Sequence, residues 1–141
     1  MKENFYPATK DLVFSKLFGE QANEEITRDL LINILGREVG KLDLDKNTDL
    51  KPLYPGEKKG VVDIKAEEKE SGILYNIEMQ VCAHKNLEER MLFYWSRMFS
   101  SQLKEGKNYK DLNPTILIIL LKEDLGLTKE IEYPHTTWQI M

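Results

Sequence analysis

The stretch VVDIKAEEKESGILYNIEMQ, from Val61 to Gln80, decides the fold. Two runs of alternating apolar and polar residues, Val61–Glu67 and Ile73–Val81, lie on either side of the turn sequence Glu70-Ser71-Gly72. Runs of this kind around a short turn that contains glycine are typical of a β-hairpin. Because side chains alternate across a strand, each strand would have one apolar and one polar face.

The register of this hairpin decides whether the two polar faces coincide. If Asp63 lies opposite Glu78, then Glu68 pairs with Ile73 and leaves the four-residue loop Lys69–Gly72, which is a common hairpin length. A loop shorter or longer by one residue would turn Asp63 to the other face. In the coinciding register the two carboxylates have Cβ atoms about 5 Å apart, where they repel unless something positive lies between them.

The polar face of the second strand carries Glu78 and, two residues on, Gln80. Two carboxylates and an amide oxygen suit a hard divalent cation such as Mg²⁺, which takes oxygen ligands and keeps several waters. The amide of Gln80 would orient a water or contact the substrate. The alternative is an ordinary solvated hairpin face, and the spacing alone leaves both interpretations open.

Two helices are predicted before the hairpin. The first follows an N-cap at Thr9 and stops at Gly19, and the second runs from Asn23 to about Leu35, with Gly36 ending it. The inward face of the second helix would consist of the apolar residues that recur at helical spacing, Ile26, Leu30, Leu31 and Ile34.

The remaining elements complete an α/β pattern. We expect a short strand at Val39–Leu44 and a loop at Asp45–Gly60 that includes one extended piece. A long helix is predicted from Asn86, as its N-cap, to Lys104. The apolar run Thr115–Leu121 is typical of a central strand buried on both faces. This order predicts a mixed central sheet with an antiparallel hairpin, a long crossover helix and flanking N-terminal helices.

The long helix combines a wide apolar arc, which includes Leu92, with a polar stripe. The stripe contains three cations and two hydroxyl groups: Arg90, Tyr94, Arg97, Ser101 and Lys104. Such groups could meet a phosphate backbone. Taken alone, the stripe favours a solvated boundary whose long side chains cover the edge of the core.

Composition bounds the class of protein. The 141 residues suit a single domain, and the net charge of −4 argues against a surface given over wholly to nucleic acid while allowing a local basic groove. The one cysteine, Cys82, excludes an internal disulfide and favours a reducing compartment. The chain has neither an apolar N-terminal signal nor an apolar run long enough to span a bilayer. We therefore expect a cytoplasmic protein without a membrane partner.

Four segments in order resemble the PD-(D/E)xK nuclease family transposases, also described as recombination-promoting nucleases. They are DLVFSKLFG at Asp11–Gly19, VVDIKA at Val61–Ala66, NIEMQ at Asn76–Gln80, and Arg90–Leu121. The resemblance covers nearly the whole chain and implies a restriction-endonuclease-like core. Family members usually continue further, so we expect residues 1–141 to form a single domain that is truncated at its C-terminus.

The resemblance implies a metal-dependent DNA endonuclease. Asp63 and Glu78 would bind Mg²⁺, for which Mn²⁺ could substitute, and Asp11 of the first helix would reach the same metal site. Gln80 stands where the wider superfamily has lysine, a variation that the family's own Glu-x-Gln pattern shows. Asp63, Glu78 and Gln80 would therefore form the catalytic set.

The resemblance also implies DNA as the partner. Arg90 and Tyr94 match the family's Arg-x-x-x-Tyr pattern on the long helix. Arg97 in the same stripe and Lys16 on the first helix complete the expected set of DNA-binding residues. Ser15 stands where the family often has lysine, which leaves Lys16 as the nearby cation.

Two other functions stay open at this point. The fold could be kept without catalysis, so that the chain binds DNA or a protein partner, and the neutral Gln80 and the early end of the chain favour this alternative. An inactive fragment that binds neither metal nor DNA is the third hypothesis. The sequence leaves the oligomeric state open, with a homo-oligomer among the options.

Overall fold

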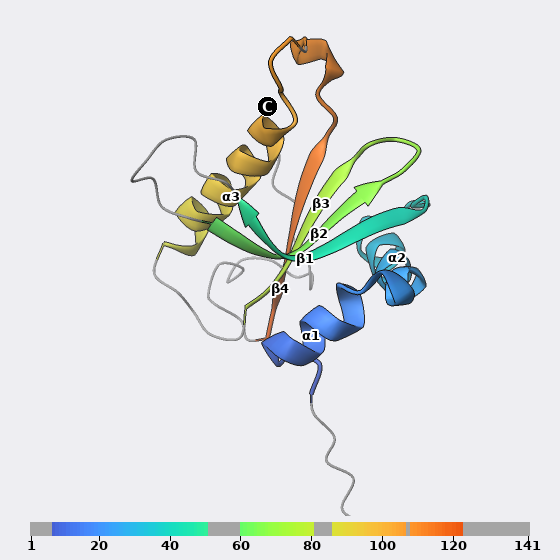
Figure 1. Ribbon diagram of the computed structural model, residues 1–141. Coiled ribbons are helices and arrows are strands. Elements are labelled where there is room, and N and C mark those ends of the chain that lie inside the picture. Colours follow the sequence, from blue (N-terminus) through green and yellow to red (C-terminus); the bar gives the residue numbers. More distant parts are fainter. Residues whose placement is uncertain (1–6, 51–59, 81–85, 107, 123–141) are drawn as a thin grey trace, which may run out of the picture.

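The computed structural model describes residues 7–50, 60–80, 86–106 and 108–122. Within these ranges three helices and four strands follow one another along the chain (Figure 1). They are α1 (Asp11–Phe18), α2 (Glu24–Leu35), β1 (Leu42–Leu50), β2 (Gly60–Glu68), β3 (Leu74–Gln80), α3 (Leu87–Ser101) and β4 (Thr115–Leu121). Two short 3₁₀ turns, Gln21–Asn23 and Tyr109–Asp111, precede α2 and β4.

The described strands form one mixed sheet in the order β1-β2-β3-β4. β1 pairs with β2, and β2 with β3, in antiparallel orientation. β3 and β4 are parallel, and the chain passes between them through α3. The predicted α/β fold, with its antiparallel hairpin and crossover helix, is confirmed.

The hairpin has the register that brings the polar faces together. Ile64 lies opposite Ile77, and Lys65 lies opposite Asn76. At the loop end, the Glu68 N–H donates to the Ile73 carbonyl oxygen at 2.9 Å. The turn requires a glycine at Gly72, because φ is +69° there and an added Cβ would fall 2.3 Å from Asn113 Nδ2.

Helices cover both faces of the sheet (Figure 1). α1 and α2 bury Phe14 and Leu31 against the face that carries Ile64, Tyr75 and Ile77. Burying each large apolar side chain of this kind contributes about 1.5–3 kcal/mol. This cluster therefore provides most of the driving force that holds the N-terminal helices to the sheet.

α3 packs on the opposite face through a smaller cluster. Met98 of α3 packs with Leu74 and Val62, and Tyr94 lies against them. The Trp95 indole N–H donates to the Thr115 carbonyl oxygen at 2.8 Å, which ties α3 to the start of β4. As a result, α3 covers the sheet face onto which the polar residues of the hairpin project.

β1 is longer than the sequence predicts. The predicted strand Val39–Leu44 and loop Asp45–Gly60 are replaced by a strand over Leu42–Leu50, and residues 51–59 lie outside the described part of the chain. The Asp and Asn residues in this stretch favour loop conformations over a strand. Pairing with β2, as in Lys46 opposite Ile64 and Thr48 opposite Val62, overrides that local preference.

Three predicted details of the N-terminal helices differ in the structure. Lys10, and not Thr9, occupies the N-cap position of α1. Ile26 is 44% exposed, whereas Thr27 is fully buried. The Thr27 hydroxyl donates to the Phe18 carbonyl oxygen at 2.6 Å, so the polar residue faces inward because it finds a partner there. The predicted ends at Gly19 and Gly36 are confirmed.

The elements after the hairpin also depart from prediction. Asn86 occupies the N-cap position of α3, but its backbone is left-handed and its side chain makes no capping bond. The helix ends at Ser101, before Lys104. β4 is an outer strand of the described sheet, and only Ile118 in it is buried, so the predicted central strand buried on both faces is wrong. An apolar run indicates apolar surroundings, but it does not indicate which strands lie on either side of it.

None of the helices within the described ranges combines the length and the apolar character needed to cross a bilayer.

Candidate metal and nucleic-acid site

Asp63 and Glu78 meet at the point where β2 and β3 stop pairing. The paired positions run from Glu67–Leu74 to Ile64–Ile77. One step further, the Asp63 backbone N–H donates to Glu78 Oε1 at 3.2 Å. The Met79 N–H donates in turn to Asp63 Oδ2 at 3.1 Å. Each carboxylate is therefore held by a backbone amide of the opposite strand, and the two side chains are directed toward each other.

The residues of this polar face are buried. Asn76 is 0% exposed, Glu78 is 5% exposed and Gln80 is 8% exposed, and they alternate along one face of β3. A solvated hairpin face, the alternative that the sequence left open, does not describe these residues. Burying polar groups is costly unless they are paired, so the burial of three on one face indicates a site more than a surface.

Glu78 is the most perturbed group of the site. Burial raises the pKa of its carboxyl to about 7, and the negative charge of Asp63 acts in the same direction. The Asp63 backbone N–H and the more distant positive charge of Arg90 oppose this rise. The pair thus has an excess of negative potential, which a bound cation would neutralise.

The amide of Asn76 is buried on the same face. Within the described part of the chain, neither Nδ2 nor Oδ1 of its buried amide has a hydrogen-bond partner. The amide lies close enough to Glu78 that a hydrogen-bonding interaction between the two side chains opposes the rise in the pKa of that carboxyl, although no full hydrogen bond forms among the described residues. Strand alternation predicted that Asn76 shares this face with Glu78, but no feature of the sequence predicted a functional role for Asn76.

The donor set fits a hard divalent cation. Asp63, Glu78 and Gln80 offer only oxygen atoms as ligands, which is the chemistry that Mg²⁺ and Mn²⁺ prefer. The two facing carboxylates supply the charge. Among the side chains that the structure describes, no three or more His, Cys, Asp or Glu residues come together as a metal-binding group.

The predicted third ligand comes from α1. Asp11 is the first residue of that helix, and the position of its side chain lies outside what the structure describes. Lys16, also on α1, is exposed and lies near enough to Glu20 to lower the pKa of that carboxyl, after the larger effects of Lys46. The described contacts do not link Lys16 to the Asp63–Glu78 pair.

α3 turns part of its polar stripe toward the sheet, while Ser101 and Lys104 stay exposed. The Arg90 guanidinium lies 5.9 Å from the centroid of the Tyr94 ring, and its charge reaches Glu78. Arg97 is 9% exposed, whereas Leu92 of the predicted apolar arc is 55% exposed. The helix is therefore rotated relative to the sequence prediction, because Tyr94 and Met98 face the sheet together.

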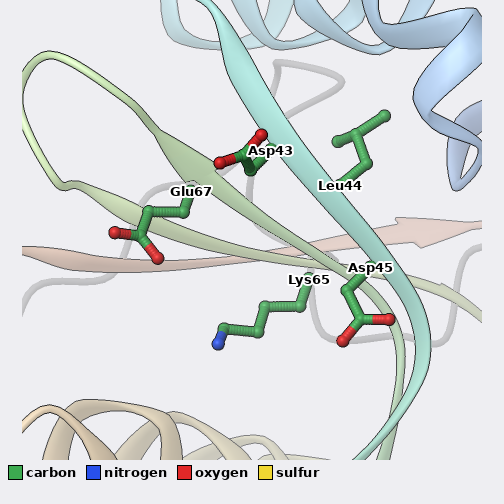
Figure 2. Close-up of a pocket in the computed structure, with 5 residues that line it drawn as sticks. All are labelled: Asp43, Leu44, Asp45, Lys65 and Glu67. Carbon is green, nitrogen blue, oxygen red and sulfur yellow. The ribbon is translucent and has the colours of Figure 1, made fainter.

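A shallow pocket of about 160 Å³ adjoins this face on β1 and β2. It is lined by Asp43, Leu44, Asp45, Lys65 and Glu67 (Figure 2). Figure 2 shows Asp45 and Lys65 projecting from one side of the sheet and Leu44 from the other. Lys65 lies between Asp45 and Asn76 in the register, which places the pocket on the sheet face that also carries the carboxylate pair. The sequence missed this pocket because it predicted a loop from Asp45 onward.

A family model described as PD-(D/E)XK nuclease family transposase matches residues 8–138. The matched range includes every candidate site residue on α1, β2, β3 and α3. No curated protein matches the chain, and no solved structure matches it.

Proposed function

Because the chain belongs to the PD-(D/E)XK nuclease family transposases, we propose that it is a DNA endonuclease that hydrolyses phosphodiester bonds with a divalent cation held by Asp63 and Glu78. Membership of the family makes a nuclease or transposase type of function the starting point. The observation that carries the proposal is the exchange of backbone hydrogen bonds that turns the two carboxylates toward each other.

Asp63 and Glu78 would hold the cation, with Mg²⁺ as the first choice and Mn²⁺ as a substitute. The hydrogen bonds at 3.2 Å and 3.1 Å orient both carboxylates before any cation arrives, so little order has to be gained on binding. Asp11 is proposed as a third ligand, because it matches the acidic residue of the family's first helix and α1 contacts β2, the strand that carries Asp63. When bound, the cation would lower the pKa of a coordinated water and offset the charge that develops on the phosphate.

Gln80 would position a water or a phosphate oxygen through its amide. It lies two residues beyond Glu78 on the same buried face. An uncharged amide stabilises developing negative charge less than an ammonium group would. The proposal therefore assigns Gln80 an orienting role and expects a modest rate of cleavage.

Arg90 and Tyr94 are the proposed contacts to the DNA backbone. Arg90 is only half-buried, and its charge reaches Glu78, so a phosphate that contacts Arg90 would lie near the carboxylate pair. The burial of Arg97 argues against a direct phosphate contact from that residue. Lys16 would contribute a separate backbone contact from α1. Because the net charge is −4, DNA contacts would be confined to a local basic region of the surface. The single cysteine supports a cytoplasmic location.

The decisive experiment measures nicking of supercoiled plasmid DNA by the purified chain in Mg²⁺, in Mn²⁺ and in EDTA. The variants are Asp63→Asn and Glu78→Gln, with Asp43→Asn as the matched control, because Asp43 is an exposed carboxylate of the same sheet that pairs with Lys69. Loss of either ligand should lower the rate on the order of 100-fold or more, while Asp43→Asn should cleave as the wild type does. Equal cleavage by wild type and Asp63→Asn would refute the assignment.

A second function is a DNA-binding or assembly module that has kept the fold without catalysis. The neutral Gln80, in the position where the wider superfamily has lysine, favours this candidate. Titrations of DNA and of Mn²⁺ separate the two functions. DNA binding in EDTA that weakens with salt, together with no detectable Mn²⁺ binding, would favour the module.

A further inference from the structure

Asn76 lies in the interior of the sheet and has no role in the function proposed above. Its neighbours in the register are Lys65 on β2 and Leu117 on β4, and its side chain is 0% exposed. Both polar atoms of its amide are buried without a hydrogen-bond partner in the described residues. This is an unusual state, since the large majority of buried side-chain polar atoms are satisfied.

The unsatisfied amide works against stability. An apolar side chain of similar shape, such as leucine, would fill the same space without burying an unpaired donor and acceptor. The packing of β3 therefore gives no reason for asparagine at this position. Among the described residues, what favours an amide here has to be sought in its polar neighbours on β3.

The neighbour that can use this amide is Glu78. The two side chains share a face of β3 at a spacing of two residues, and both are buried beneath α3. Glu78 Oε1 is already held by the Asp63 N–H at 3.2 Å. An asparagine amide carries two N–H donors, so Asn76 can hold the same carboxylate from the other side.

We propose that Asn76 is a positioning residue, whose amide holds the Glu78 carboxylate in the orientation that binds the divalent cation. Asn76 acts through Glu78 and does not itself bind the metal. The inference rests on the proposed function, because it concerns the same cation site. Groups that orient metal ligands in this way typically change metal affinity about 10- to 100-fold when they are removed.

The test compares Asn76→Leu with Thr48→Val. Thr48 Oγ1 on β1 is also buried without a hydrogen-bond partner in the described residues, so Thr48→Val removes a similar defect at a residue outside the site. Thermal unfolding in EDTA reports stability, and calorimetric titration with MnCl₂ reports metal affinity. Both variants should unfold at or above the wild-type Tm. Only Asn76→Leu should bind Mn²⁺ more weakly, by about 10-fold or more.

Each failure has a separate meaning. If the wild type does not bind Mn²⁺, or if Asp63→Asn binds it equally well, the proposed function fails first. If Asp63→Asn loses Mn²⁺ binding but Asn76→Leu binds like the wild type, the positioning role alone is overturned. A Tm of Asn76→Leu well below the wild type, or a failure of that variant to fold, would also overturn it, because the amide would then be a structural partner in the metal-free chain.

Discussion

The backbone N–H of Asp63 donates to the Glu78 carboxylate at 3.2 Å, so one residue of the pair orients the other before any ligand is bound. The Asp63 carboxylate takes the Met79 N–H in return. This exchange replaces regular strand pairing at the end of the hairpin. The two hydrogen bonds hold both carboxylates close together, whereas in the unfolded chain their mutual repulsion would keep them apart.

The first prediction concerns metal-dependent stability. Mn²⁺ at 100 times its Kd should raise the free energy of unfolding of the wild type by about 2.7 kcal/mol. In Asp63→Asn that gain should vanish, because the cation loses a ligand charge. Without metal, the variant should be at least as stable as the wild type, since the repulsion of Glu78 is removed. Urea unfolding with and without MnCl₂ measures both effects, with Asp43→Asn as the control that should retain the gain.

The second prediction concerns Gln80. Gln80→Lys should raise the rate of plasmid nicking about 10-fold, because an ammonium group stabilises developing negative charge better than an amide does. The same change should lower Tm, since Gln80 is 8% exposed and an ammonium is costly to bury. Gln80→Leu is the matched control and should lower cleavage. A nicking rate of Gln80→Lys at or below that of Gln80→Leu would contradict the role.

The third prediction concerns DNA affinity. Arg90→Ala should weaken binding to DNA of any sequence and should reduce the slope of log affinity against log salt by about 1. The reason is that a phosphate contact contributes charge and no base recognition. Arg28→Ala on α2, in the helical layer on the opposite face of the sheet, is the control. Fluorescence anisotropy at several salt concentrations gives the slope, and an unchanged slope for Arg90→Ala would exclude the contact.

The fourth prediction concerns acid stability and Glu68. Burial raises the pKa of this carboxyl, but bonds from the Gly40 N–H at 2.6 Å and the Tyr75 hydroxyl at 2.8 Å, with the Arg37 charge, outweigh it and hold the pKa below its usual value. A lowered pKa in the folded state means that the stabilisation is present above the unfolded pKa and is lost as pH falls through the folded one.

Glu68→Gln should therefore lower the free energy of unfolding at pH 7, by about 1–3 kcal/mol. The difference from the wild type should shrink as the pH falls from the unfolded-chain pKa of about 4.3 through the lower pKa of the folded carboxyl. Urea unfolding at a series of pH values measures this convergence. Glu67→Gln, one residue away and exposed, should track the wild type throughout. A gap between Glu68→Gln and the wild type that stays constant with pH would show that its cause is packing and not charge.

The sequence predicted the hairpin and its register because both depend on local rules. Alternation has a period of two, and the loop Lys69–Gly72 has a fixed length, so Asp63 could face Glu78 in one register only. The helix ends at Gly19 and Gly36 were predictable because glycine is common at a helix terminus. Gly36 takes the left-handed backbone there, with φ at +65°, whereas Gly19 is right-handed and its added Cβ would fall 2.6 Å from the Ser15 carbonyl oxygen.

Tertiary structure alone decided how deeply the site is buried. Local sequence did not predict one continuous strand from Leu42 to Leu50, because its partner β2 supplies the pairing that the Asp and Asn residues of this stretch do not favour. The rotation of α3 that buries Arg97 and exposes Leu92 is likewise set by packing on the sheet. That packing covers Glu78 and buries the Asn76 amide without a hydrogen-bond partner among the described residues. A polar strand face whose exposure the sequence left open thus becomes a buried face that carries Asn76, Glu78 and Gln80, because burial depends on what packs above a residue and not on its neighbours in the chain.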